Sequence, residues 1–271
     1  MKSYSLLNIT GNKRSIADQI FSILPLDCSG LTYVDPFFGS GGAYFNVSRN
    51  FLSYECSDLF PLIINFICQD FSNEILSDYY NKVTQKWDFH NKDAYYNFRE
   101  FWNENREKGP RIKYIGFMLL AGACINGLYR FGPNGFNQSY GNRIMKKEQL
   151  LDYKKHIKSN SSFSIKNFLD IVPSKTSVLY LDPPYSDTGA LTQMFGFWEL
   201  GLAQDLNLIR LIKSQDECNG KFILSTIKNS FLHNELKDTF RNIDIKKTYK
   251  VSVGKHLASS HEEIIVTNLG D

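Results

Sequence analysis

The segment LTYVDPFFGSGG, residues 31–42, decides the fold. Its first part is rich in the aromatic and β-branched side chains that favour a buried strand, and its second part is a glycine turn. The segments that follow predict a helix at 43–50, a strand at 51–58 and a second helix at 59–71. Strands and helices in this alternation predict a parallel sheet with right-handed crossover connections.

Outward from this unit, the character of the chain changes twice. A helix is expected before it at 13–24, and residues 71–126 are helical in character. Strand patterns return near the end of the chain, in TSVLYLD, KFILST, IDIKKTYKVSV and EEIIVTN. The segments between these regions are a loop rich in Gly and Asn at 127–143, a helix near 146–158 and a helix at 202–214.

We therefore expect an α/β fold of the Rossmann-like type with a mostly parallel central sheet. A catalytic domain would combine residues 1–70 and 160–271, and a helical domain at 71–159 would be inserted into it. A chain of 271 residues is long enough for this arrangement. The loop at 127–143 would belong to the inserted domain.

The charge of the chain is concentrated in the expected insertion. Residues 106–158 contain eleven Lys and Arg against three Asp and Glu, although the net charge of the whole chain is only +3. A basic middle between acidic flanks is typical of a site for a polyanion. The alternative is an ordinary solvated helical surface, and charge alone does not separate the two.

Several classes of protein are disfavoured. The five cysteines form no C-x-x-C pair, which argues against a zinc ribbon and fits free thiols in the cytoplasm. The five histidines show no paired metal spacing, so we expect no metal. The N-terminus lacks the apolar stretch of a secretion signal, and no apolar run is long enough to span a bilayer.

The glycine turn and a later acid predict a nucleoside site. Gly39, Gly41 and Gly42 follow a strand, where glycine lets the backbone approach a ligand. Tyr44 stands where a dinucleotide motif would need its third glycine, which weakens the NAD interpretation. Asp58 ends the next strand, about twenty residues on, where a carboxylate can accept hydrogen bonds from both ribose hydroxyls. S-adenosylmethionine (SAM) is a nucleoside without phosphate that fits this layout.

The sequence DPPY, residues 182–185, follows a second buried strand and predicts chemistry at an amine. The Asp182 carboxylate and the Pro183 carbonyl can accept hydrogen bonds from both hydrogens of an aromatic amino group, and the prolines fix where that carbonyl points. Tyr185 offers a ring on which a flipped base can stack. The alternative, a rigid strand exit and no more, becomes weak beside the glycine turn, Asp58 and the basic insertion.

With these motifs in this order, the chain resembles the Dam-class N6-adenine DNA methyltransferases, particularly the compact phage type. The segments that carry the resemblance are TGNKRSIADQIFSILP, YVDPFFGSGG, SDLFPLIINF, NFLDI, LDPPYSD and FGFW. It implies catalysis by Asp182, Pro183, Pro184 and Tyr185, with Lys13 in contact with cofactor or DNA. The cofactor site implied by the resemblance comprises Ile9, Thr10, Gly11, Asn12, Lys13, Asp35, Pro36, Phe37, Phe38, Gly39, Ser40, Gly41, Gly42, Asp58, Asn167, Phe168, Asp170 and Asp182.

The loop NGLYRFGPNGFNQSYGNR resembles the target-recognition loop of the family. The resemblance implies that Arg130 and Arg143 contact DNA, because the arginine fork reads guanine and also binds phosphate. Aromatic residues such as Tyr129 can either pack the loop or insert into the base stack. The predicted DNA-binding residues are Asn126, Tyr129, Arg130, Asn137, Ser139 and Arg143. GATC is the leading target, although Ser139 replaces a proline and Asn126 replaces a serine of the phage pattern.

These observations favour a SAM-dependent enzyme that methylates the N6 amine of a flipped adenine in double-stranded DNA. We expect it to act as a monomer or weak dimer on DNA. Two alternatives stay open at this point. The first is an RNA adenine or N4-cytosine methyltransferase, which would share the fold and most of the pocket. The second is a catalytically inactive DNA-binding protein of the same fold.

Overall fold

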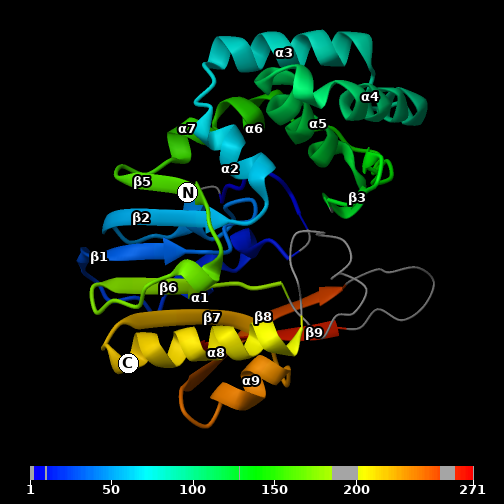
Figure 1. Cartoon of the computed structure of the whole chain (residues 1–271). Helices are drawn as coiled ribbons and strands as arrows, with labels where there is room; N and C mark the ends of the chain where they lie inside the picture. The colour runs from blue at the N-terminus through cyan, green and yellow to red at the C-terminus, as the bar shows by residue number, and fades with distance from the viewer. Residues whose placement is uncertain (1–2, 10, 128, 185–200, 251–259, 271) are drawn as a thin grey trace.

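The computed structural model describes residues 3–9, 11–127, 129–184, 201–250 and 260–270. Its centre is a seven-stranded sheet in the order β5-β2-β1-β6-β7-β9-β8, and β3 and β4 form a separate hairpin (Figure 1). β9 runs antiparallel to both of its neighbours, and the other pairings in the sheet are parallel. The strands are β1 (Cys28–Asp35), β2 (Phe51–Asp58), β3 (Phe131–Gly132), β4 (Gly135–Phe136), β5 (Ser161–Ile165), β6 (Ser177–Leu181), β7 (Lys221–Ile227), β8 (Arg241–Lys250) and β9 (Ser260–Thr267).

The two faces of the sheet pack against different helices. On one face Phe21 of α1 (Ala17–Phe21) contacts Tyr33 of β1 and Tyr180 of β6, with ring centroids 6.2 Å and 5.4 Å away. On the other face α8 (Leu202–Glu217) buries Leu208 and Ile212 in a cluster with the alternate residues of β6 and β7. This alternation of buried side chains to both faces is the pattern of a doubly covered sheet.

A helical segment between β2 and β5 lies beyond the β5 edge of the sheet (Figure 1). Trp102 of α4 is fully buried there and donates its indole N–H to the Ile112 carbonyl at 2.9 Å. The buried residues of this segment and of the sheet form one continuous hydrophobic cluster. The helices between these strands are α2 (Pro61–Cys68), α3 (Asn73–Lys86), α4 (Lys92–Asn105), η3 (Arg106–Lys108), η4 (Arg111–Ile115), α5 (Gly116–Ala123), η5 (Ile125–Gly127), α6 (Lys147–Leu151) and α7 (Tyr153–His156).

The sequence prediction was wrong at one element after the glycine turn. The helix expected at 43–50 is a single 3-10 turn, η2 (Tyr44–Asn46), because Val47 is already extended with ψ of 123°. The helix expected at 13–24 is also shorter, and consists of η1 (Lys13–Ser15) and α1. Strand β5 and the helices α9 (Phe231–Leu236) and η6 (Phe168–Asp170) were not predicted.

Candidate active site

Three carboxylates lie at the carboxyl ends of adjacent strands. Asp35 is the last residue of β1, Asp58 is the last residue of β2, and Asp182 follows β6 directly. Because β1 pairs in parallel with both β2 and β6, the three ends meet at one edge of the sheet. The strand order also reverses direction at β1, and open α/β sheets bind their ligands in the crevice at such a switch point.

The glycine turn after β1 is closely packed. Gly41 has a φ of +75°, and a Cβ on it would overlap the ring of Phe45. A Cβ on Gly42 would overlap the side-chain amide of Asn12, which donates a hydrogen bond to Ser40 Oγ at 2.6 Å. Only glycine combines this left-handed backbone with the absence of a side chain. The turn and the segment before Lys13 are thereby held together.

Asp58 is a buried acceptor at the end of β2. Its side chain accepts hydrogen bonds from the Gly39 N–H at 2.7 Å and from the Phe60 N–H at 2.8 Å. Burial raises the pKa of Asp58 to about 6, against the opposing effect of these N–H donors. A carboxylate has about four acceptor positions, so Asp58 retains capacity for further donors such as a pair of hydroxyls.

Asp35 is a second buried acid, only 1% exposed. It accepts hydrogen bonds from the Phe37 N–H at 3.2 Å and from the Tyr33 hydroxyl at 3.3 Å. Burial raises the pKa of Asp35 well above its ordinary value, and the charges of Asp182 and Asp58 raise it further. The strand ends therefore crowd carboxyl groups into a region of low dielectric.

Lys13 supplies the positive charge among these acids. Its side chain is 3% exposed, and its ammonium nitrogen lies 2.9 Å from Asp182 Oδ1 and 2.8 Å from Glu263 Oε1. It also donates to the Gly11 carbonyl at 3.2 Å. Glu263, on β9, accepts a further hydrogen bond from Ser225 Oγ at 2.5 Å. Neither Glu263 nor Ser225 was predicted, because no motif connects them with the residues near the N-terminus.

Two aromatic rings border the same edge. Phe37, after β1, and Phe168, after β5, have ring centroids 5.4 Å apart, and both side chains are buried. Asn167 caps η6 by accepting a hydrogen bond from the Leu169 N–H at 3.0 Å, which fixes the position of Phe168. Asp170 is exposed at the end of the same turn.

The other predicted cofactor and catalytic residues lie around this edge or outside the described residues. Ile9 is half-buried, and its Cδ1 is 3.8 Å from where a Cβ on Gly39 would lie. Two predicted residues, Thr10 and Tyr185, lie outside the described residues, so the DPPY motif is described only as far as Pro184. The buried members are Pro36, Phe38 and Pro183, and Pro184 is half-buried.

The predicted recognition loop is anchored at both ends. Asn126 and Gly127 have left-handed φ values of 55° and 62°. A Cβ on Gly127 would lie 2.9 Å from the Ile9 Cα, so the start of the loop packs directly on the segment that leads to Lys13. At the other end Arg143 donates to the Cys124 carbonyl at 2.9 Å.

Within this loop the predicted DNA-binding side chains divide into exposed and buried ones. Arg130, Asn137 and Ser139 are exposed, and Arg130 Nε donates to Asn137 Oδ1 at 2.8 Å. Tyr129 is only 3% exposed, and its ring stacks on Phe60 with centroids 5.1 Å apart. The Tyr129 ring therefore packs the loop against the residue that also contacts Asp58.

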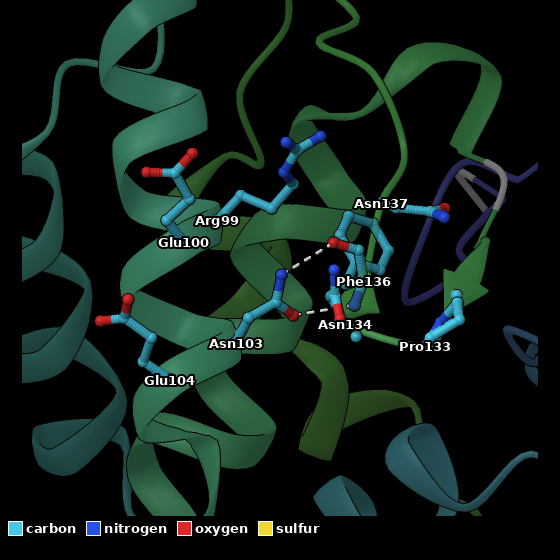
Figure 2. A pocket seen from close by; sticks show the side chains of 10 residues that line it. Arg99, Glu100, Asn103, Glu104, Pro133, Asn134, Phe136 and Asn137 are labelled. Atoms are coloured by element: carbon cyan, nitrogen blue, oxygen red, sulfur yellow. Dashed lines mark hydrogen bonds between the residues drawn. The ribbon is translucent and has the colours of Figure 1, made fainter.

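Residues of α4 and of the β3–β4 hairpin line a hollow of about 460 Å³. Figure 2 shows Asn103 of α4 beside Phe136 of the hairpin. The Asn103 amide both donates to the Phe136 carbonyl at 2.9 Å and accepts from the Phe136 N–H at 2.8 Å. Arg99 and Asn137 also line this hollow. Asn103 therefore fixes the hairpin on α4 at its base.

Several cations of the basic segment form ion pairs with acidic residues of the protein. Lys113 lies 2.7 Å from Glu107, Lys154 lies 2.5 Å from an oxygen of Asp70, and Lys155 pairs with Asp152. Arg130 and Arg143 hydrogen-bond to neutral groups instead. These hydrogen bonds do not neutralise the positive charge of the two arginines, whereas the ion pairs neutralise the charge of the paired lysines.

The comparisons with known proteins address the chain as a whole. The model of the D12 class N6 adenine-specific DNA methyltransferases matches residues 10–251. The chain belongs to this family. It is 28% identical over 261 residues to a DNA adenine methylase of Haemophilus influenzae, across 92% of this chain and 88% of that protein. It is 24% identical to the retron Ec67 DNA adenine methylase of Escherichia coli, across 97% of this chain and 91% of that protein.

A third relative comes from a virus, Paramecium bursaria Chlorella virus NC1A. The chain is 23% identical over 270 residues to its type II methyltransferase M.CviBI, across 96% of this chain and 95% of that protein. The D12-class match and the sheet order together identify a Rossmann-like methyltransferase fold. Among the described residues, no helix is long and apolar enough to cross a membrane, and no cluster of His, Cys, Asp and Glu fits a metal ion.

Proposed function

We propose that this D12-class methyltransferase transfers a methyl group from SAM to the N6 amine of a flipped adenine in a short duplex site. The observation that carries the proposal is the meeting of Asp58 and Asp182 at adjacent strand ends, on either side of β1 and its glycine turn. Asp58 would accept hydrogen bonds from the ribose hydroxyls, and Asp182 would accept one from the target amine. We take GATC as the leading target sequence, read from the loop at 127–143.

The residues at the strand ends fit the nucleoside part of SAM. Asp58 is a buried carboxylate with acceptor capacity beyond its two backbone donors, as a ribose diol requires. Phe37 and Phe168 provide buried rings beside it for the cofactor adenine. SAM would supply the activated methyl group as a sulfonium. Thr10, Gly11 and Asn12 would border the rest of the cofactor in the segment before Lys13.

Catalysis by the chain itself would consist of holding the amine. Asp182 would accept a hydrogen bond from one amino hydrogen and the Pro183 carbonyl from the other, which directs the nitrogen lone pair toward the methyl group. Tyr185 would stack on the flipped adenine. The buried ammonium of Lys13 lies 2.9 Å from Asp182, and an ionised carboxylate can only accept hydrogen bonds.

DNA recognition would come from the exposed part of the loop and its hairpin. Arg130 and Arg143 would contact bases or phosphates, and Asn126, Asn137 and Ser139 would add contacts nearby. The inserted helical unit at 71–159 would carry this loop. A monomer or weak dimer in the cytoplasm would suffice for this reaction, because each strand of a duplex site can be modified in turn.

The test is transfer of tritiated methyl groups from SAM to unmethylated genomic DNA, followed by sequencing that maps N6-methyladenine. We expect label at adenine in one short motif, and no label with Asp182→Asn. The matched control is Asp244→Asn, which removes an exposed carboxylate on β8 that pairs with Lys228. We expect this control to retain wild-type activity.

Other results would favour the alternatives. Label in RNA or at cytosine would replace the duplex adenine with another target. A wild-type protein that binds SAM and DNA but transfers no methyl group would indicate an inactive member of the family. A motif other than GATC would overturn only the proposed specificity.

A further inference from the structure

A buried chain of polar groups connects β7, β9 and the N-terminal segment with the end of β6. Ser225 Oγ donates to Glu263 Oε1 at 2.5 Å, and Lys13 Nζ lies 2.8 Å from the same oxygen. Lys13 Nζ then lies 2.9 Å from Asp182 Oδ1. The exposed fractions of the side chains are 3% for Lys13, 4% for Glu263 and 20% for Asp182. Of these connected side chains, Asp182 is the one that is partly exposed to solvent.

Glu263 does more than balance the charge of Lys13, because it also helps to hold the ammonium group in one position. An ammonium group has three N–H donors. Among the described residues its acceptors include Asp182, Glu263 and the Gly11 carbonyl, which lie on three different segments of the chain. An ammonium held from three sides has little freedom to rotate or shift. The oxygen of Asp182 that contacts it is therefore fixed relative to β9.

We propose that Glu263 is a positioning residue, which acts through Lys13 to fix the carboxylate of Asp182 for methyl transfer. The inference rests on the proposed function, because Asp182 is the group assigned to hold the target amine. Misplacement of a reacting group by about 1 Å can cost about 100-fold in rate. Loss of Glu263 would leave Lys13 free to move toward Asp182 and to rotate its carboxylate.

The test compares Glu263→Gln with Glu262→Gln in the full-length protein. Glutamine preserves the shape of residue 263 and can still accept from Ser225, but it removes the charge that holds Lys13. Glu262 is the matched control, since it neighbours Glu263 on β9 but is 67% exposed and pairs with Lys228 at the surface. The measurements are the single-turnover rate of methyl transfer and the KM values for SAM and duplex DNA.

We expect Glu263→Gln to lower the single-turnover rate by about 10- to 100-fold. We expect both KM values to stay within about twofold of wild type, and Glu262→Gln to behave as wild type. A purely structural role would lower the melting temperature but leave the rate of the folded fraction unchanged, and that result would overturn the inference. If wild type transfers no methyl group, the proposed function fails, and the inference fails with it.

A double-mutant cycle tests whether the effect passes through Lys13. In a Lys13→Met background, Glu263→Gln should change the remaining rate by less than about twofold, because the connecting group is gone. An equal loss in both backgrounds would overturn the proposed route. If Glu263→Gln does not fold, Ser225→Ala replaces it, since this change leaves all three charges and removes only the hydroxyl that holds Glu263. An unchanged rate in Ser225→Ala would then overturn the inference.

Discussion

The affinity of the protein for its cofactor should fall as the pH falls through 6, because of Asp58. Burial raises the pKa of this carboxyl to about 6, while the Phe60 and Gly39 N–H groups oppose the shift. Ribose hydroxyls donate best to an ionised carboxylate. A protonated Asp58 would instead present an O–H to them. The cofactor should therefore bind more tightly when Asp58 is ionised.

The size of the effect follows from the fraction of Asp58 that is ionised. With a pKa of about 6, about nine molecules in ten are ionised at pH 7 and about one in ten at pH 5. The apparent dissociation constant rises in proportion to the loss of the competent fraction. We thus expect binding to weaken about tenfold between pH 7 and pH 5, and to change little between pH 7 and pH 8.

Isothermal titration calorimetry with S-adenosylhomocysteine at pH 5, 6, 7 and 8 measures this dependence. Asp58→Asn provides the control, because any titration of the ligand itself is common to both proteins. The variant should bind more weakly at pH 8 and lose the pH dependence below 7. Equal pH dependence in the two proteins, or a flat profile for wild type, would refute the assignment of Asp58 to the ribose.

Three further predictions concern stability and DNA binding. In the ligand-free protein, the pKa of Asp58 is higher in the folded state than its unfolded value of about 4. The contribution of Asp58 to the free energy of unfolding is therefore largest below pH 4 and is lost as the pH rises through 6. Relative to Asp58→Asn, urea denaturation should show wild type losing about 2 kcal/mol between pH 4 and pH 7. Gly41→Ala should lower the free energy of unfolding by about 2–4 kcal/mol, through the overlap with Phe45 and the left-handed backbone. Gly30→Ala, with no atom within 4 Å of the added Cβ, should not do so. Arg130→Ala should weaken duplex binding by about 1–3 kcal/mol in fluorescence anisotropy, whereas Lys82→Ala on α3 should not.

Each of these predictions has an outcome that contradicts it. Parallel stability curves for wild type and Asp58→Asn would mean that Asp58 does not titrate in this range. Equal stability of the two glycine variants would mean that the turn can relax around a methyl group. Equal DNA binding by Arg130→Ala and Lys82→Ala would remove Arg130 from the recognition surface.

The central strands could be predicted because their signals are local. β6 and β7 are buried along almost their whole length. β1 and β2 are buried mainly toward their carboxyl ends, where each strand ends in an aspartate. β5 (Ser161–Ile165) was not predicted, because this edge strand alternates polar and apolar residues and has no apolar run. The helix expected at 43–50 failed because tertiary packing of Phe45 and the extended Val47 override a weak local preference.

The candidate site shows the same division. Asp58 and Asp182 could be singled out in the sequence because each stands at the end of a recognisable strand. Glu263 was not, because its contact with Lys13 depends on β9 inserting antiparallel between β7 and β8, which no local spacing reveals. Tyr129 illustrates the remaining limit, since an aromatic residue in a loop looks the same in sequence whether it is exposed or stacked on Phe60.

The position of β9 has a consequence for when the protein becomes an enzyme during its synthesis. β9 is synthesised after β7 and β8, yet it occupies a place inside the sheet, between these two strands. Until it arrives, Lys13 near the start of the chain has no contact with Glu263. The arrangement around Asp182 is then completed only after β9 has been synthesised. A nascent chain would therefore complete the contacts of Asp182 well after β1 and β2, with Asp35 and Asp58 at their ends, have been synthesised.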